Sequence, residues 1–137
     1  MNPYIHKVHY YETDKMGIVH HSNYIRWFEE ARSDFLEQIG YGYDRMEREG
    51  IISPVIEIHA KYRSMTRFGE MVNIVVKMIR FTGLKFELEY IISDSVTGEI
   101  RVTGSSEHCL LDRDSKPVRL KKVNPELYAL LDSCVEK

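Results

Sequence analysis

Strand-like segments that follow one another without an intervening helix constrain the fold of this chain more than any other feature. The clearest alternation puts Phe86, Leu88, Tyr90 and Ile92 on one face and Glu87 and Glu89 on the other. Residues 56–62 and 72–78 show the same period of two, and residues 100–111 predict a last long strand. Turn-forming residues at 82–84 and 94–98 separate the later segments. Strands joined by such short turns pair antiparallel, because a parallel return requires a long crossover.

One long amphipathic helix is predicted N-terminal to these strands, from about Ser22 to the residue before Gly40. Its apolar positions recur at spacings of three and four: Tyr24, Trp27, Phe28, Ala31, Phe35 and Ile39. Ser22 is the expected N-cap, and Gly40 is expected to end the helix. At about 1.5 Å per residue the helix is roughly 25 Å long. We expect its aromatic stripe to cover one face of the sheet, which gives an α+β fold.

The rest of the chain adds smaller elements around this arrangement. A first strand is expected at residues 4–10, a short helix at 43–49 and a terminal helix at 124–135. No linker or repeat divides the sequence, so we expect residues 1–137 to form a single domain. Val75, Ile79 and Ile91 place apolar side chains on the second face of the sheet. That face therefore favours a homo-oligomer.

Composition excludes several classes of protein. The chain has 43% hydrophobic and 29% charged residues and a formal net charge of −2, so nucleic acid is not an expected partner. Two cysteines are too few for a disulfide framework. Residues 1–12 contain no apolar signal core, and no apolar run approaches the roughly 20 residues of a membrane span. We therefore expect a cytoplasmic protein.

The loop and helix entrance at residues 10–24 carry a resemblance to a known family. This segment reads YYETDKMGIVHHSNY and contains the pattern D-x-x-G-[IV]-V-x-H-x-x-Y from Asp14 to Tyr24. It resembles the signature of the 4-hydroxybenzoyl-CoA thioesterase family, especially its YbgC-type acyl-CoA thioesterase branch. The resemblance implies a hotdog fold, in which a five-stranded antiparallel sheet wraps a long helix. It also implies an acyl-CoA substrate, no cofactor, active sites at the interface of a homodimer, and dimers that often pair into a homotetramer.

Asp14 is the central catalytic residue that this resemblance implies. A thioester releases a thiolate whose conjugate acid has a pKa of about 8.5, so hydrolysis requires a polarised carbonyl and a nucleophile more than a strong acid. Helix N-terminal amides near residues 20–23 suit an oxyanion, and by family analogy the chief donor is the main-chain N–H of His21. Asp14 then attacks the carbonyl directly or activates a water. The plainer alternative is a loop carboxylate that only caps its own turn.

Two aromatic residues flank Asp14 in this pattern. His21 matches a branch histidine that binds or orients substrate or water, and its simpler interpretation is an exposed histidine at a helix entrance. Tyr10 matches a branch tyrosine that can hydrogen-bond the aspartate or the reacting water, although a core aromatic at a strand end is the simpler interpretation. The helical aromatics Tyr24, Trp27 and Phe28 are expected in the core rather than in an acyl pocket.

Further residues are candidates for substrate binding. Asn23 is expected to brace the loop through its side-chain amide, and Lys85 follows the turn at which the family often places a cation that contacts CoA. No metal site is expected, since the adjacent His20 and His21 point in different directions. His20 stands where the branch often has tyrosine. Cys109 is rejected as a nucleophile because His108, its neighbour in a strand, faces the opposite side.

Two other functions compete with thioester hydrolysis. A hotdog dehydratase would act on 3-hydroxyacyl thioesters with a paired base and acid. A non-catalytic module would only bind acyl-CoA or an acyl carrier protein, and the carboxylate of Asp14 argues against it. The acyl group, the choice between CoA and acyl carrier protein as thiol carrier, and the choice between dimer and tetramer stay open at this point.

Overall fold

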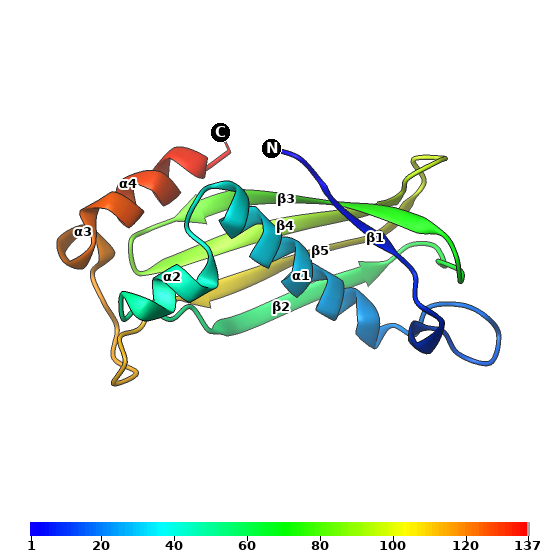
Figure 1. The fold of residues 1–137 in the computed structure, drawn as a ribbon, viewed down its shortest axis with the longest axis horizontal. Helices are drawn as coiled ribbons and strands as arrows, with labels where there is room; N and C mark the ends of the chain where they lie inside the picture. Colours follow the sequence, from blue (N-terminus) through cyan, green and yellow to red (C-terminus); the bar gives the residue numbers. More distant parts are fainter. Residues whose placement is uncertain (137) are drawn as a thin grey trace. The chain divides into compact units, whose positions relative to one another are not determined.

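The computed structural model describes residues 1–136, and its elements follow the predicted order (Figure 1). The strands are β1 (Tyr4–Lys7), β2 (Val55–Tyr62), β3 (Met71–Phe81), β4 (Lys85–Asp94) and β5 (Ile100–Cys109). The helices are α1 (Ser22–Gln38), α2 (Tyr43–Arg48), α3 (Leu120–Val123) and α4 (Pro125–Cys134), with a 3₁₀ helix η1 at Tyr10–Glu12. None of the helices within residues 1–136 is long and apolar enough to cross a membrane.

All five strands form one sheet in the order β1-β3-β4-β5-β2. β1 pairs antiparallel with β3, with Tyr4 opposite Ile74. The turn between β3 and β4 is closed by Thr82 N–H, which donates to the carbonyl of Lys85 over 2.9 Å. The predicted α+β class with a five-stranded antiparallel sheet is confirmed.

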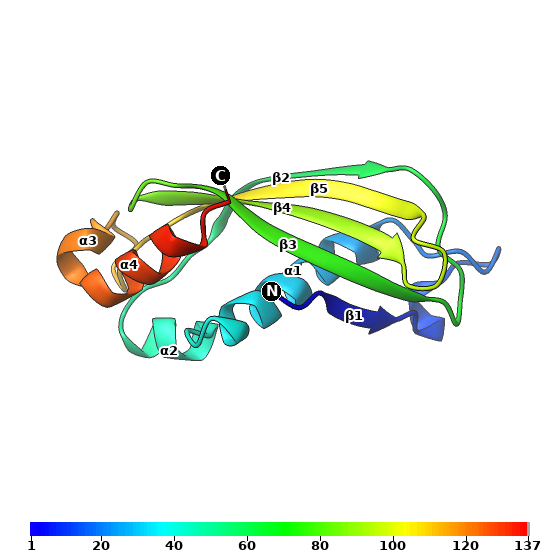
Figure 2. The same ribbon diagram turned by 90° about the horizontal axis from the view of Figure 1, so that it is seen from above.

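Packing divides the chain into two compact units. Unit 1 comprises Met1–Phe35, Ala60–Val76 and Tyr90–Gly104, and unit 2 comprises Leu36–His59, Lys77–Glu89 and the described residues from Ser105 onward. In unit 1, α1 lies against β4 (Figure 2), where the rings of Phe28 and Tyr90 stack at 4.3 Å. The guanidinium of Arg32 donates to the hydroxyl of Tyr90 over 3.0 Å. The aromatic stripe of α1 therefore forms the core of unit 1.

Three local expectations for unit 1 are wrong. The first strand ends at Lys7 rather than at Tyr10, because His9 N–H donates to the buried carboxylate of Glu12 and turns the chain into η1. This turn carries Tyr10 to the surface, where its side chain is 80% exposed instead of part of the core. Ser22 is the first residue of α1 rather than its N-cap, and its hydroxyl lies 2.8 Å from Nδ1 of His20.

Unit 2 is built around α3, α4 and the β3–β4 turn. The side chain of Asn124 caps α4 by accepting from Leu127 N–H over 3.1 Å. Leu120 N–H donates to the carbonyl of Gly83 over 3.2 Å, which fixes α3 to the turn. Gly83 has φ +87°, and a Cβ there would approach the ring of Tyr128 to 3.0 Å. The turn therefore requires glycine on both counts.

β2 is one of the two edge strands, and most of it is exposed on both faces. Val55, Ile56 and Tyr62 are each between 44% and 48% exposed. An edge strand presents a row of unpaired main-chain N–H and C=O groups, so a second strand can add to it. The apolar side chains on β2 make this edge the natural place for such an addition.

Candidate active site

The loop that carries Asp14 is a small hairpin. Thr13 bridges to Val19, Asp14 N–H donates to the carbonyl of Ile18 over 2.9 Å, and Gly17 N–H donates to the carbonyl of Asp14 over 3.0 Å. Gly17 takes φ +76°, as the predicted turn requires. The returning limb is fixed to the loop before β3, since Val19 N–H donates to the carbonyl of the fully buried Thr66 over 2.8 Å.

Asp14 itself is half-buried at the start of this turn. Its Oδ1 accepts a hydrogen bond from Met16 N–H at 2.8 Å, the geometry of an Asx turn. Its Oδ2 has no hydrogen-bond partner within residues 1–136. One carboxylate oxygen is thus held by the main chain, and the other is available to a substrate or a water.

The entrance to α1 leaves one amide without an acceptor. The amides around it donate as follows: His20 to the carbonyl of Glu12 (2.9 Å), Ser22 to Nδ1 of His20 (3.3 Å), Asn23 to the carbonyl of His20 (3.0 Å) and Tyr24 to the carbonyl of His21 (3.3 Å). The main-chain N–H of His21 has no acceptor within residues 1–136. This N–H can therefore donate to a ligand at the start of the helix. The partial positive charge of the helix N-terminus favours an oxygen with negative charge at the same place.

A cavity of about 450 Å³ lies beside this junction in unit 1. Its walls are Val19, His21, Tyr24, Tyr62, Arg63, Ser64 and Met65. The ring of His21 meets the ring of Tyr62 edge-on at 6.0 Å, and the hydroxyl of Tyr24 donates to Oγ1 of Thr66 over 3.1 Å. Most of the lining is apolar or aromatic, which suits an acyl group more than a charged one.

The predicted site residues are distributed unevenly around this cavity. The exposed His21 lines it. Tyr24 is buried, as expected of a core residue, but it also lines the cavity, which was not expected. Asp14 and Tyr10 do not line it within one chain; the ring of Tyr10 packs edge-on against Phe68 at 5.6 Å. Asn23 is buried, and its Nδ2 donates to the carbonyls of Glu12 (2.9 Å) and His20 (3.2 Å), so it ties the loop to the helix entrance.

Glu12 is a buried ionisable residue next to this site that the sequence analysis did not single out. It is 4% exposed, and its Oε2 accepts from the indole N–H of Trp27 at 2.6 Å. Its Oε1 accepts from His9 N–H at 2.7 Å and lies 2.9 Å from Nε2 of His6. Burial acts to raise the pKa of Glu12, but these hydrogen bonds outweigh it and lower the pKa below its usual value. Glu12 belongs to no periodic pattern in the sequence, so its burial and its hydrogen bonds could not be predicted.

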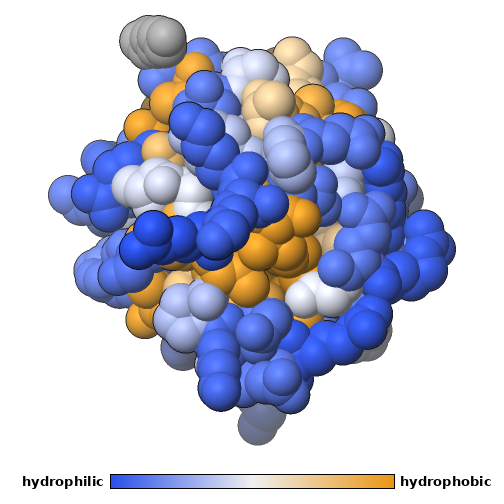
Figure 3. All heavy atoms as spheres, turned by 90° about the vertical axis from the view of Figure 1, so that its left-hand side faces the viewer, coloured by the Kyte–Doolittle hydropathy of each residue, from blue (hydrophilic) through white to orange (hydrophobic). Residues whose placement is uncertain are grey.

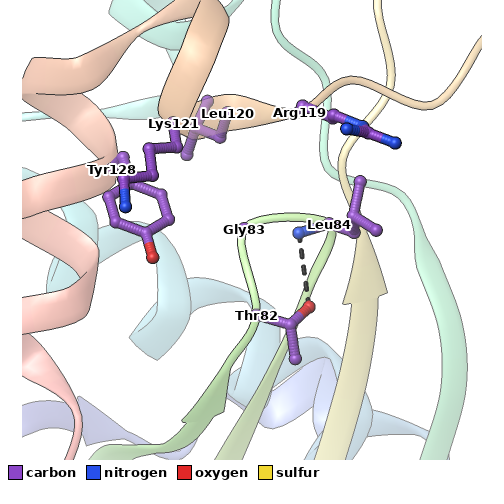
Figure 4. A pocket seen from close by; sticks show the side chains of 7 residues that line it. All are labelled: Thr82, Gly83, Leu84, Arg119, Leu120, Lys121 and Tyr128. Atoms are coloured by element: carbon purple, nitrogen blue, oxygen red, sulfur yellow. Dashed lines mark hydrogen bonds between the residues drawn. The ribbon is translucent and has the colours of Figure 1, made fainter.

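Unit 2 holds a second cavity, of about 240 Å³, at the β3–β4 turn (Figure 4). Its lining residues are Thr82, Gly83, Leu84, Arg119, Leu120, Lys121 and Tyr128. The ammonium of Lys121 lies 5.6 Å from the centre of the Tyr128 ring. Figure 3 shows the surface at this end of the ribbon, where hydrophobic side chains gather in a hollow ringed by hydrophilic ones. Lys85, predicted to contact CoA, is exposed just beyond the turn, and its main-chain N–H donates to Oγ1 of Thr82 over 3.1 Å.

A five-stranded antiparallel sheet that packs on one long helix, with a glycine turn leading into that helix, defines a hotdog-fold protein. Residues 8–131 match the family model of the thioesterase-like superfamily, and the chain belongs to this family. The predicted family and fold are thereby confirmed.

Individual relatives agree with this membership. The putative acyl-CoA thioesterase YneP of Bacillus subtilis is 34% identical over 123 residues, which cover 89% of this chain and 88% of the relative. A putative esterase of Aquifex aeolicus is 31% identical over 120 residues, or 87% of this chain and 91% of the relative. The solved structure of a DHNA-CoA thioesterase from Staphylococcus aureus superposes with a TM-score of 0.90 at 33% identity, covering 96% of this chain and 89% of that chain.

Proposed function

We propose that this protein hydrolyses an acyl-CoA thioester to the free acid and CoA. The observation that carries the proposal is the unpaired amide of His21, at a residue that also lines the apolar cavity of unit 1. Membership of the thioesterase-like superfamily, and relatives named acyl-CoA and DHNA-CoA thioesterases, support the same reaction.

The thioester carbonyl oxygen would accept a hydrogen bond from His21 N–H. This hydrogen bond strengthens as negative charge develops on the oxygen. One such donor stabilises the transition state by on the order of 3 kcal/mol in well-studied enzymes. Asp14 would take a proton from water through its free Oδ2 while the hydroxide bonds to the carbonyl carbon. The tetrahedral intermediate then re-forms the carbonyl and expels the CoA thiolate as the C–S bond breaks, and Asp14 gives up its proton to the thiolate or to solvent. Direct attack by Asp14, through a mixed anhydride that water then hydrolyses, is the alternative route.

A homodimer would complete this site. Asp14 does not line the cavity of its own chain, and the free edge of β2 offers apolar side chains and unpaired main-chain groups to a second copy. We therefore propose that two β2 strands pair antiparallel and that the partner chain helps to enclose the thioester.

Substitution of Ile56, which is 47% exposed on β2, tests this arrangement. We expect Ile56→Asp to convert the dimer to a monomer at micromolar concentration and to lower kcat/KM at least about tenfold, since each copy would bring a carboxylate into an apolar interface. Light scattering coupled to size exclusion measures the mass. The matched control is Val96→Asp, a change at a 90% exposed turn residue, which should leave mass and activity unchanged. A wild-type monomer with full activity would exclude the dimer.

The basic cavity of unit 2 supports CoA as the thiol carrier. Arg119 and Lys121 bring two cations to it, and Lys85 lies just beyond the turn that forms one wall. CoA carries phosphates, which guanidinium and ammonium groups bind well. We propose that these residues hold phosphate groups of CoA, with Lys85 as the substrate-binding residue that the family pattern indicates.

Comparison of two thiol carriers tests this assignment. Arg119→Ala should raise KM for acyl-CoA about tenfold, the size of one charge-assisted hydrogen bond. The same variant should leave KM unchanged for the acyl-N-acetylcysteamine thioester, which has no phosphate. Lys77→Ala, a change at an exposed lysine of β3, is the control. Equal effects on both substrates would contradict phosphate binding.

Thiol release over a panel of acyl-CoA substrates tests the reaction itself. The panel should span short and long aliphatic chains and aromatic groups, including 1,4-dihydroxy-2-naphthoyl-CoA. Release of free thiol above the spontaneous rate is expected for at least one member. A 3-hydroxyacyl-CoA that instead develops enoyl absorbance without thiol release would indicate the dehydratase.

A further inference from the structure

Three side chains of the kinds that bind transition metals meet in unit 1, outside the proposed thioester site. They are His6 on β1, His9 before η1 and Glu12 at its end, and their ligand atoms all lie within 4.8 Å of one another. His6 and Glu12 are 5% and 4% exposed, whereas the side chain of His9 is exposed. Nothing in the proposed hydrolysis uses the two histidines.

The separations are close to those around a metal ion. Bonds from zinc to imidazole nitrogen and carboxylate oxygen are about 2.0–2.2 Å, so two ligands of a tetrahedral ion lie about 3.4 Å apart. Nε2 of His6 and Oε1 of Glu12 are 2.9 Å apart, so they need to separate by only about 0.5 Å to share an ion. The 4.8 Å limit on these separations exceeds that spacing by about 1.4 Å, so the ligand atom of His9 must move inward by up to about that distance. The exposed ring of His9, stacked on Tyr11 at 5.3 Å, can make that movement without disturbing the core.

The surroundings of Glu12 resemble the outer shell of a metal site. Trp27 Nε1–H and His9 N–H both donate to the carboxylate and fix its orientation, as the groups behind metal-bound carboxylates do. The side chain nearest the carboxylate that can carry positive charge is His6, which is charged only when protonated. A divalent ion in the place of that proton would compensate the buried negative charge.

We propose that His6, His9 and Glu12 bind a divalent transition-metal ion of the zinc class. Two imidazoles and one carboxylate would supply three ligands, with water as the fourth on the exposed side of His9. The ion would tie β1 to η1, and through Trp27 to α1. Because the carbonyl of Glu12 also accepts from His20 N–H, the bound ion would stiffen the segment that leads to the helix entrance.

Calorimetric titration of the chelator-treated full-length protein with ZnCl₂ tests the site without any activity measurement. We expect one ion per chain with micromolar or tighter affinity, and a Tm that rises by several degrees with zinc. His9→Gln should weaken binding at least about tenfold, since even outer-shell changes cost 10–100-fold in metal affinity. This residue is exposed, so the variant is expected to fold.

His59→Gln is the matched control. His59 lies 2.6 Å from Glu57 in an exposed pair, and these two residues belong to no group of three candidate ligands within residues 1–136. Zinc binding should be unchanged in this variant. Undetectable binding by the wild type at 100-fold excess zinc, or equal affinity in wild type and His9→Gln, would overturn the proposal.

Discussion

Asp14→Asn is expected to lower kcat at least about 100-fold while KM for the same acyl-CoA changes little. The amide keeps the shape of the side chain, and its oxygen can still accept from Met16 N–H as Oδ1 does. What the amide loses is the ability to take a proton from water or to attack a carbonyl, which is typically worth 10²–10⁴ in rate. Steady-state thiol release with the best substrate of the panel measures both constants.

A second turn aspartate provides the control for this prediction. Oδ1 of Asp112 accepts from Asp114 N–H at 2.8 Å and from Lys116 N–H at 3.0 Å, so it caps a turn much as Asp14 does. Asp112→Asn should leave kcat unchanged. If both variants turn over at the wild-type rate, Asp14 is only a turn cap, and another group activates the water.

The larger elements of the fold were predictable because their signals are local. The stripe from Tyr24 to Phe35 and the alternation in β4 arise from periods of 3.6 and 2 that each element shows by itself. β1 was predicted too long because its end depends on the carboxylate of Glu12, which captures His9 N–H and turns the chain. Side-chain capture of a main-chain group leaves no periodic trace in the sequence.

The site was predictable only in its loop. The motif from Asp14 to Tyr24 located the glycine turn and the helix entrance. It also indicated His21 as the residue whose main-chain N–H is available to a ligand. Arg119 and Lys121 gave no signal, because they approach the β3–β4 turn only after the chain has completed β4 and β5. His6, His9 and Glu12 likewise meet only because the strand ends at Lys7 and η1 begins directly after His9.

Trp27→Ala is expected to destabilise the protein by about 3–5 kcal/mol, the usual cost of removing a large buried aromatic. Trp27 is fully buried, and its indole also donates to the carboxylate of Glu12. Trp27→Phe keeps much of the apolar volume but leaves Oε2 of Glu12 without that donor. We expect it to cost about 1.5–3 kcal/mol, the range for a hydrogen bond to a charged group.

Urea unfolding of the two variants separates packing from hydrogen bonding at this position. A midpoint that falls in both, with the larger fall in Trp27→Ala and unchanged m-values, is the expected result. Tyr11→Ala removes an aromatic ring that is 78% exposed and should shift stability by no more than about 0.5 kcal/mol. A Trp27→Phe protein as stable as the wild type would mean that Glu12 does not depend on the indole. In that case the helix would be joined to η1 by packing and by the Asn23 side chain, which donates to the carbonyl of Glu12. The ordered carboxylate that the metal proposal requires would then lack one of its two fixed donors.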